Sequence, residues 1–283
     1  MEQAGKIMEA IRKPNFLAGN GTDFQGKSID EIEQEIVEVS NRQPGHLTGY
    51  DCPKCMNRGY FWAYQDGQRF IRDCECAPVR ESIKELRRSG LREVMDKYTF
   101  EAFQCREQWQ AAVKSDVLQF VNDENRQWLL LAGQPGAGKT HLGTAAAVRF
   151  LKAGIPVRYM LWIEDGTRLK AVINDAAAYA RLINPLKTCK VLYIDDLFKR
   201  KNDQRDNRQT DMVDRGDIRL AFDIINYRYI NHLTTIISTE RMPEDLFLID
   251  EGTGSRIHER TKAHQVVIRY DRSKNWRISR HGT

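Results

Sequence analysis

The stretch WLLLAGQPGAGKTHLGTAAAVRFL, residues 128–151, joins an apolar run to a helical pattern through a glycine-rich turn. Within it, Gly133, Gly138, Lys139 and Thr140 match the pattern G-x-x-x-x-G-K-[ST]. The apolar run predicts a buried strand, and the pattern after the turn predicts a helix. In this order, backbone N–H groups can surround phosphate groups at the positive end of the helix. The stretch therefore predicts a nucleotide-phosphate loop in an α/β fold.

The residues of this loop are the candidate ATP-binding residues. Lys139 is expected to reach the β- and γ-phosphates, and the hydroxyl of Thr140 is expected to bind Mg²⁺. The complete set of predicted ATP-binding residues is Gly133, Gln134, Pro135, Gly136, Ala137, Gly138, Lys139, Thr140 and His141.

A second apolar run, VLYIDD at 191–196, ends in two carboxylates. We expect it to lie beside the phosphate loop, with Asp195 in the Mg²⁺ shell and Asp196 orienting the attacking water. Many hydrolytic ATPases have Glu at the second position. The shorter Asp196 therefore predicts slow hydrolysis of ATP.

Five short runs rich in Val, Ile, Leu and Tyr alternate with helical patterns in the rest of the chain. They are residues 127–133, 155–162, 190–197, 234–240 and 264–270. Strands separated by helices predict a five-stranded parallel sheet covered on both faces. The polar stretch 199–217 predicts a mobile loop.

The stretch CPKCMNRGYFWAYQDGQRFIRDCEC, residues 52–76, contains two cysteine pairs. Cys52, Cys55, Cys74 and Cys76 supply four thiolates, enough for a tetrahedral Zn²⁺ site with no open ligand position. The second pair, C-x-C, is tighter than the usual C-x-x-C, and His46 is an alternative ligand. We expect the zinc to be structural.

The part of the chain around the cysteines predicts a small zinc-binding domain with helices at 1–97, followed by an ATPase domain at 98–283. Ser28 and Glu31 have the spacing of a capping box before a helix ending near Ser40. A second helix is expected from Pro78 to Gly90. Its basic face is either solvated or contacts an acidic partner or nucleic acid, and consists of Arg80, Lys84, Arg87 and Arg88.

Composition sets limits on the class of protein. The 283 residues are 29% charged with a formal net charge of +5, which permits nucleic-acid binding without requiring it. The first residues lack the apolar region of a secretory signal, and no run approaches the roughly 18 apolar residues of a membrane span. We therefore expect a cytoplasmic protein with no membrane partner.

With these motifs in place, residues 50–283 resemble the DnaC/DnaI-type helicase loaders of bacteria and phages, a branch of the AAA+ ATPases. Besides the cysteines, the phosphate loop and VLYIDD, several stretches carry the resemblance. They are SGLREVMDKYTFEAF (89–103), IINYRY (224–229), TTIISTER (234–241), DEGTGSRIHE (250–259) and NWR (275–277).

The resemblance implies roles for three further residues. Glu240, beside Thr239, stands where the family places its sensor of the γ-phosphate. Arg256 stands at the arginine finger, whose guanidinium stabilises charge on the phosphoryl group of the ATP in a neighbouring subunit. Arg228 is a second candidate for contact between subunits.

The function implied is ATP-dependent loading of a replicative hexameric helicase of DnaB type onto single-stranded DNA, during initiation or restart of replication. The zinc-binding domain would dock on the helicase, and the ATPase domain would self-associate through ATP interfaces. The candidate residues for contact with single-stranded DNA are Arg168, Lys170, Arg181 and Lys187.

Three alternatives remain open. The first is an IstB-like transposition helper ATPase, although such helpers usually lack the cysteine motif. The second is a zinc-dependent nucleic-acid-binding module with a vestigial ATPase. The third is a P-loop kinase of small molecules, against which the arginine-finger motif speaks.

Overall fold

The computed structural model describes residues 27–88, 95–125, 127–199, 201–202, 209–210 and 213–279. The chain folds as two compact units, the first ending at Cys74 and the second beginning at Glu75. The sequence predicts a domain boundary near residue 97. The helix α3 (Ala77–Arg88) nevertheless packs with strand β4 of the second unit and so belongs to that unit.

In the first unit, helix α2 (Ile29–Asn41) precedes a hairpin of β1 (Tyr60–Gln65) and β2 (Gln68–Asp73). The predicted capping box is confirmed, since the amide of Glu31 donates to Ser28 Oγ at 3.3 Å and the amide of Ser28 donates to Glu31 Oε2 at 2.7 Å.

Helix α2 covers one face of the hairpin. Tyr64 donates to Asp30 at 2.5 Å, and Arg69 pairs with Glu33 at 2.8 Å. Since side chains alternate along a strand, Phe61, Ala63, Phe70 and Arg72 share the opposite face. That face is not covered by α2.

The second unit contains a parallel sheet with the strand order β4-β5-β8-β3-β9, which confirms the predicted five-stranded sheet. Every residue of β3, β5 and β8 is buried, as expected for strands covered on both faces. The strands are β3 (Leu129–Gly133), β4 (Val157–Leu161), β5 (Val191–Asp195), β8 (Thr234–Thr239) and β9 (Gln265–Ile268).

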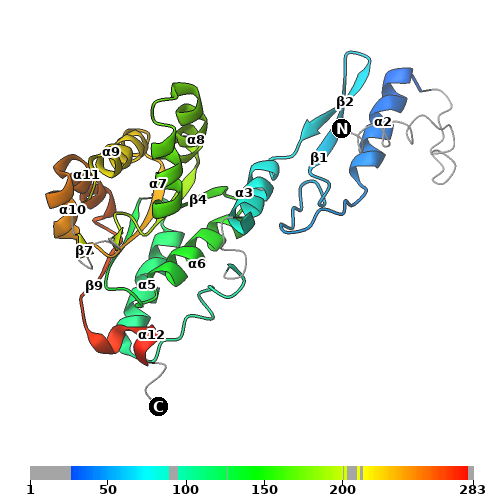
Figure 1. Ribbon diagram of the computed structural model, residues 1–283. Coiled ribbons are helices and arrows are strands. Elements are labelled where there is room, and N and C mark those ends of the chain that lie inside the picture. Colours follow the sequence, from blue (N-terminus) through cyan, green and yellow to red (C-terminus); the bar gives the residue numbers. More distant parts are fainter. Residues whose placement is uncertain are drawn as a thin grey trace. The chain divides into compact units, whose positions relative to one another are not determined.

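Helices cover both faces of this sheet (Figure 1). On one face, α6 (Lys139–Lys152) crosses the sheet, with α3 and α5 (Gln108–Asn122) packed beside it. On the other face, the helices α7 to α11 contribute Leu169, Ile183, Leu220, Leu246 and Ile257 to one apolar core. These helices are α7 (Trp162–Ala171), α8 (Ala176–Thr188), α9 (Arg215–Ile230), α10 (Pro243–Ile249) and α11 (Glu251–Thr261).

Two short elements, η2 (Arg272–Lys274) and α12 (Trp276–Ser279), follow β9. Much of the polar stretch 199–217 lies outside the described residues, apart from two two-residue strands, β6 (Lys201–Asn202) and β7 (Gln209–Thr210). The predicted loop extends too far toward the C-terminus, because helix α9 already begins at Arg215. Asp214 caps this helix by accepting from the amide of Asp217. Among the described helices, none has the length and apolar character to cross a membrane.

Candidate nucleotide site and cysteine cluster

The phosphate loop connects the end of β3 to the start of α6, as the sequence predicts. Gly133 and Gly136 have positive φ values of 115° and 76°. A Cβ at Gly133 would lie 2.0 Å from the carbonyl oxygen of Ile268, and one at Gly136 would lie 2.2 Å from Asn275 Oδ1. Both positions therefore favour glycine, because the paired strand β9 and the C-terminal segment approach the loop closely.

The side chain of Lys139 is buried against its own loop. Its Nζ donates to the carbonyl oxygens of Gly133 at 2.7 Å and Gln134 at 2.8 Å. Burial lowers the pKa of Lys139 to about 8, although the nearby carboxylates of Glu240 and Asp196 act in the opposite direction. The ammonium group lies next to the loop that is expected to hold the phosphates.

Hydroxyl groups surround the carboxylate of Asp195 at the end of β5. Thr140 donates to Oδ1 at 3.3 Å, Tyr193 donates to Oδ1 at 2.9 Å and Tyr159 donates to Oδ2 at 3.0 Å. Ser238 of β8 also donates to Oδ1. Burial raises the pKa of Asp195, and these hydroxyl donors only partly offset it. Thr140 and Asp195, the predicted Mg²⁺ ligands, are thus adjacent.

Asp196 continues from Asp195 in the left-handed region, with φ 60°. Its amide donates to Ser238 Oγ at 3.0 Å, and its carboxylate pairs with Lys199 Nζ at 2.5 Å. The sequence did not single out Ser238, Lys199, Tyr159 or Tyr193. The signal for Ser238 is its position one residue before the end of β8, the strand paired with β5.

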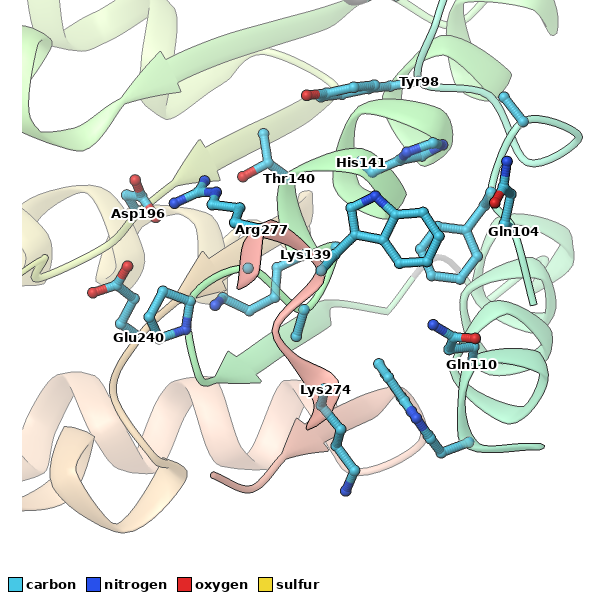
Figure 2. A pocket seen from close by; sticks show the side chains of 18 of the residues that line it. Tyr98, Gln104, Gln110, Lys139, Thr140, His141, Asp196, Glu240, Lys274 and Arg277 are labelled. Atoms are coloured by element: carbon cyan, nitrogen blue, oxygen red, sulfur yellow. The ribbon is translucent and has the colours of Figure 1, made fainter. Parts of the chain in front are cut away.

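Lys139 and Thr140 of the loop, with Asp196, Lys199 and Glu240, line a cavity of about 380 Å³, within the range usual for small-ligand sites. Figure 2 shows Lys139, Thr140, Asp196, Glu240 and Arg277 around one part of it. Tyr98, Gln104, Gln110 and His141 lie around another part of the wall. The cavity therefore joins the phosphate loop and both carboxylate-bearing strand ends to the segment that precedes α5.

His141, a predicted ATP-binding residue, lines the cavity but also fastens the segment around Thr99 to α6. Its ring stacks on Tyr98 with centroids 4.7 Å apart, contacts Phe103 edge-on and lies with Nε2 2.8 Å from the carbonyl oxygen of Thr99. Burial lowers the pKa of His141, so the neutral ring is favoured.

The C-terminal segment closes over the phosphate loop. The amide of Trp276 donates to the carbonyl of Gly136 at 3.0 Å, and the amide of Asp271 donates to Gln134 Oε1 at 2.6 Å. Arg277 follows directly and lines the cavity (Figure 2). The motif NWR was visible in the sequence, but the sequence did not indicate that its arginine lines this cavity.

Arg256, the predicted arginine finger, is not among the described residues that line this cavity. It lies on α11, with its guanidinium over the rings of Phe222 at 5.2 Å and Tyr229 at 5.5 Å, and it donates to the carbonyl of Gly252 at 2.7 Å. A role for Arg256 at the ATP of a neighbouring subunit stays a prediction.

The predicted role of Arg228 in subunit contact is wrong. Its side chain is fully buried and donates to the carbonyls of Leu186, Cys189 and Thr234 and to the hydroxyl of Thr235. The guanidinium is used inside the domain, where it connects the end of α8 to the start of β8.

The predicted basic residues differ in how accessible they are. Lys170 pairs with Asp217 at 2.7 Å, and Lys187 pairs with Asp223. Arg80 is buried, so its place on a basic face of α3 that is solvated or contacts a partner is wrong, whereas Lys84, Arg87 and Arg88 are exposed.

The four predicted cysteines come together. Their Sγ atoms all lie within 4.8 Å of one another, and those of Cys52 and Cys74 are 3.8 Å apart. A Zn–S distance of about 2.3 Å in tetrahedral geometry places sulfur atoms about 3.8 Å apart. The amide of Gly59 donates to Cys55 Sγ at 3.2 Å, which stabilises a thiolate. The cluster fits a zinc site and does not include the exposed His46.

Comparison with known proteins shows the family to which this chain belongs. The family described as "IstB-like ATP binding protein" matches residues 75–243, more than half of the chain. The phage-like element PBSX protein XkdC of Bacillus subtilis (strain 168) is 33% identical over 261 residues, covering 85% of this chain and 91% of that protein. The chain belongs to the IstB-like ATP-binding family. Its core is an ATP-binding domain with the AAA+ fold.

Two further similarities support this family membership and the fold. The uncharacterized protein YqaM of Bacillus subtilis (strain 168) is 32% identical over 212 residues, covering 72% of this chain and 65% of that protein. A solved structure described as the DnaC helicase loader has a TM-score of 0.53 at 23% identity, covering 62% of this chain and 99% of that one. This similarity shows the shared fold and confirms the predicted AAA+ architecture.

Proposed function

We propose that this ATPase loads a replicative hexameric DNA helicase of DnaB type onto single-stranded DNA. The observation that carries the proposal is the combination, in one chain, of a four-cysteine cluster and an ATPase core with the fold of a DnaC helicase loader. In this proposal ATP binding changes the affinity for the partner and modifies no other substrate.

At the nucleotide site, the loop amides and Lys139 would hold the β- and γ-phosphates. Thr140 and Asp195 would hold Mg²⁺, which neutralises charge on the phosphate oxygens. Asp196 would orient the attacking water, and Glu240 would sense the γ-phosphate. The adjacency of Thr140 and Asp195, and the presence of Asp196 and Glu240 on the cavity wall, support these roles.

Zinc is proposed as a structural ion of the four-cysteine cluster, three of whose ligands belong to the first unit. The hairpin and one helix bury little apolar surface, and no residue of α2 is fully buried. Structural zinc contributes on the order of 10–16 kcal/mol in comparably small folds. The ion would therefore hold the docking unit in a defined conformation.

The hairpin face opposite α2 is the proposed contact with the helicase. It presents Phe61, Phe70 and Arg72, and Phe70 remains 38% exposed. Aromatic and arginine side chains are the residue types that most often dominate binding energy at protein interfaces. The double substitution Phe70→Ser with Arg72→Ser is expected to weaken binding of the helicase and leave ATP binding intact.

DNA contact and self-association are proposed from residues that do not line the cavity. Arg168 and Arg181 are exposed on α7 and α8. Lys170 and Lys187 would have to exchange their carboxylate partners for DNA phosphates, so we expect them to contribute less to DNA binding. Arg256 would act on the ATP of an adjacent subunit in an assembly of several copies.

The test is light scattering of the protein mixed with a replicative helicase of DnaB type, with and without ATP. A stable complex that disappears with Cys52→Ser is expected. Cys105→Ser is the matched control, because Cys105 is exposed and lies outside the cluster.

Absence of a complex in every nucleotide state would contradict the loader proposal. The family match favours an IstB-like transposition helper as the second candidate, since it covers the ATPase core and starts only at residue 75. Stimulation of a transposase by ATP-bound protein would then support that candidate.

A further inference from the structure

Lys199 holds the carboxylate that is proposed to orient the attacking water. Its Nζ lies 2.5 Å from Asp196 Oδ2. The two residues are brought together by a tight turn in which Asp196 and Phe198 both have positive φ, 60° and 53°. Phe198 is buried, and its carbonyl accepts from Arg241 Nε at 3.0 Å. The turn that presents Lys199 is therefore fixed by the segment after β8.

The pair is accessible to a ligand in the nucleotide cavity. Lys199 and Asp196 both line it, and their side chains are 36% and 18% exposed. Burial alone would lower the pKa of Lys199, but its hydrogen bond and charge interaction with Asp196 outweigh burial and raise it. Lys199 is thus a protonated ammonium in a partly exposed ion pair, and such pairs are easily exchanged.

The terminal phosphate of ATP needs a cation in this part of the cavity. The loop, Lys139 and the Mg²⁺ proposed at Thr140 and Asp195 serve the phosphates on the side of α6, whereas Asp196 and Glu240 place two further carboxylates on the cavity wall. These carboxylates repel a γ-phosphate unless a positive charge lies between them and it. Lys199 is a cavity-lining ammonium on a flexible stem with three rotatable donors.

We propose that Lys199 is a ligand of the γ-phosphate that distinguishes ATP from ADP, and that ATP draws its ammonium away from Asp196. Asp196 is then released to orient water only when the third phosphate is present. With ADP the pair with Asp196 persists. The inference rests on the proposed nucleotide site and adds to it a residue that couples recognition of ATP to the catalytic carboxylate.

The test compares the dissociation constants of a non-hydrolysable ATP analogue and of ADP, both with Mg²⁺, by titration calorimetry. Lys199→Met is expected to weaken binding of the ATP analogue about tenfold, the effect of one charge-assisted hydrogen bond, and to change ADP binding less than about twofold. Lys199→Arg, which keeps the charge, is expected to retain most of the preference for ATP. Equal losses for both nucleotides, or no loss for either, would overturn the inference.

Three further variants sharpen this test. Lys84→Met removes a lysine with a similar local ion pair, to Glu81 three residues away at 3.3 Å, and should change neither affinity. Asp196→Asn removes the resting partner of Lys199 and should strengthen binding of the ATP analogue alone. If Asp196→Asn leaves the ratio of the two affinities unchanged, Lys199 does not exchange partners.

Lys139→Ala separates failure of the inference from failure of the site. If it abolishes binding of both nucleotides while Lys199→Met leaves their ratio unchanged, the nucleotide site stands and the role of Lys199 is wrong. If Lys139→Ala binds both nucleotides normally, the proposed site itself is wrong and the inference falls with it.

Discussion

A Cβ atom at Gly143 would lie 2.5 Å from the hydroxyl oxygen of Tyr193. Gly143 is on α6 and Tyr193 is on β5, so the missing side chain lets the helix approach the strand closely. The same tyrosine hydroxyl donates to Asp195 at 2.9 Å. A glycine in the helix after the phosphate loop is therefore part of what holds the carboxylate proposed to bind Mg²⁺.

Gly143→Ala is expected to displace the ring of Tyr193 and to lower the free energy of unfolding by about 1–3 kcal/mol. The displaced hydroxyl no longer restrains Asp195, so the Mg²⁺ concentration needed for half-maximal ATPase activity should rise. Gly166→Ala is the matched control, because a Cβ in helix α7 would meet Leu220 at an ordinary 3.7 Å. That change should be neutral or stabilising. Equal melting temperatures of the two variants would contradict the role given to Gly143.

The fold was largely predictable because its strands are buried on both faces. Such strands appear as continuous apolar runs, and the runs at 127–133, 190–197 and 234–240 each coincide with one. The weakly patterned helix α5 gave no comparable signal. Thr140 and Asp195 were predictable as partners because the motifs place one at the start of the helix after β3 and the other at the end of another strand of the same parallel sheet.

The roles of the remaining site residues depend on contacts in the folded protein that cannot be derived from the spacing of residues in the sequence. Tyr193 looks like an ordinary strand residue two positions before Asp195, and only the register of β4 with β5 brings the hydroxyl group of Tyr159 to the same carboxylate. Arg228 looks like a residue on an exposed helix face. Its acceptors come from the segments around Leu186 and Thr234, which are adjacent to it only after folding.

Arg228→Met is expected to lower the free energy of unfolding by at least about 3 kcal/mol, because buried carbonyl groups lose their donors. Because the side chain of Arg228 is fully buried, the substitution should not change the self-association of the molecules that remain folded. Urea unfolding combined with sizing of the folded fraction measures both. A stable variant that fails to assemble would restore the role in subunit contact.

The neutral ring of His141 predicts a dependence of stability on pH. Burial lowers its pKa in the folded state below the ordinary 6.5, so in the window just below 6.5 the unfolded chain binds the proton more readily. Stability should therefore rise with pH toward 6.5 and level off above it. His141→Gln should reduce this slope in urea unfolding between pH 5 and 7.5. His258→Gln, at an exposed position, is the control and should keep it.

Removal of the metal tests the cysteine cluster independently of any partner. The purified protein is expected to contain about one zinc per chain, and a strong chelator should expose the backbone amides of residues 27–74 to hydrogen exchange while those of the parallel sheet stay protected. Cys74→Ser should have the same effect without chelator. Unchanged protection of the hairpin after complete loss of zinc would show that the ion is not structural.

The rings of Phe222 and Tyr229 fix the direction of the Arg256 guanidinium, so they should affect hydrolysis only when they belong to the subunit that donates the arginine. Lys139→Ala subunits mixed with Arg256→Ala subunits should recover part of the ATPase activity, because the first retain the arginine and the second retain the nucleotide site.

Adding Phe222→Leu to the Lys139→Ala subunit should reduce this recovered activity about tenfold. Adding it to the Arg256→Ala subunit should leave the recovered activity unchanged, since that ring has no arginine to position. Equal losses in the two mixtures would mean that Phe222 supports only the fold, and no recovery in the first mixture would mean that Arg256 does not act between subunits.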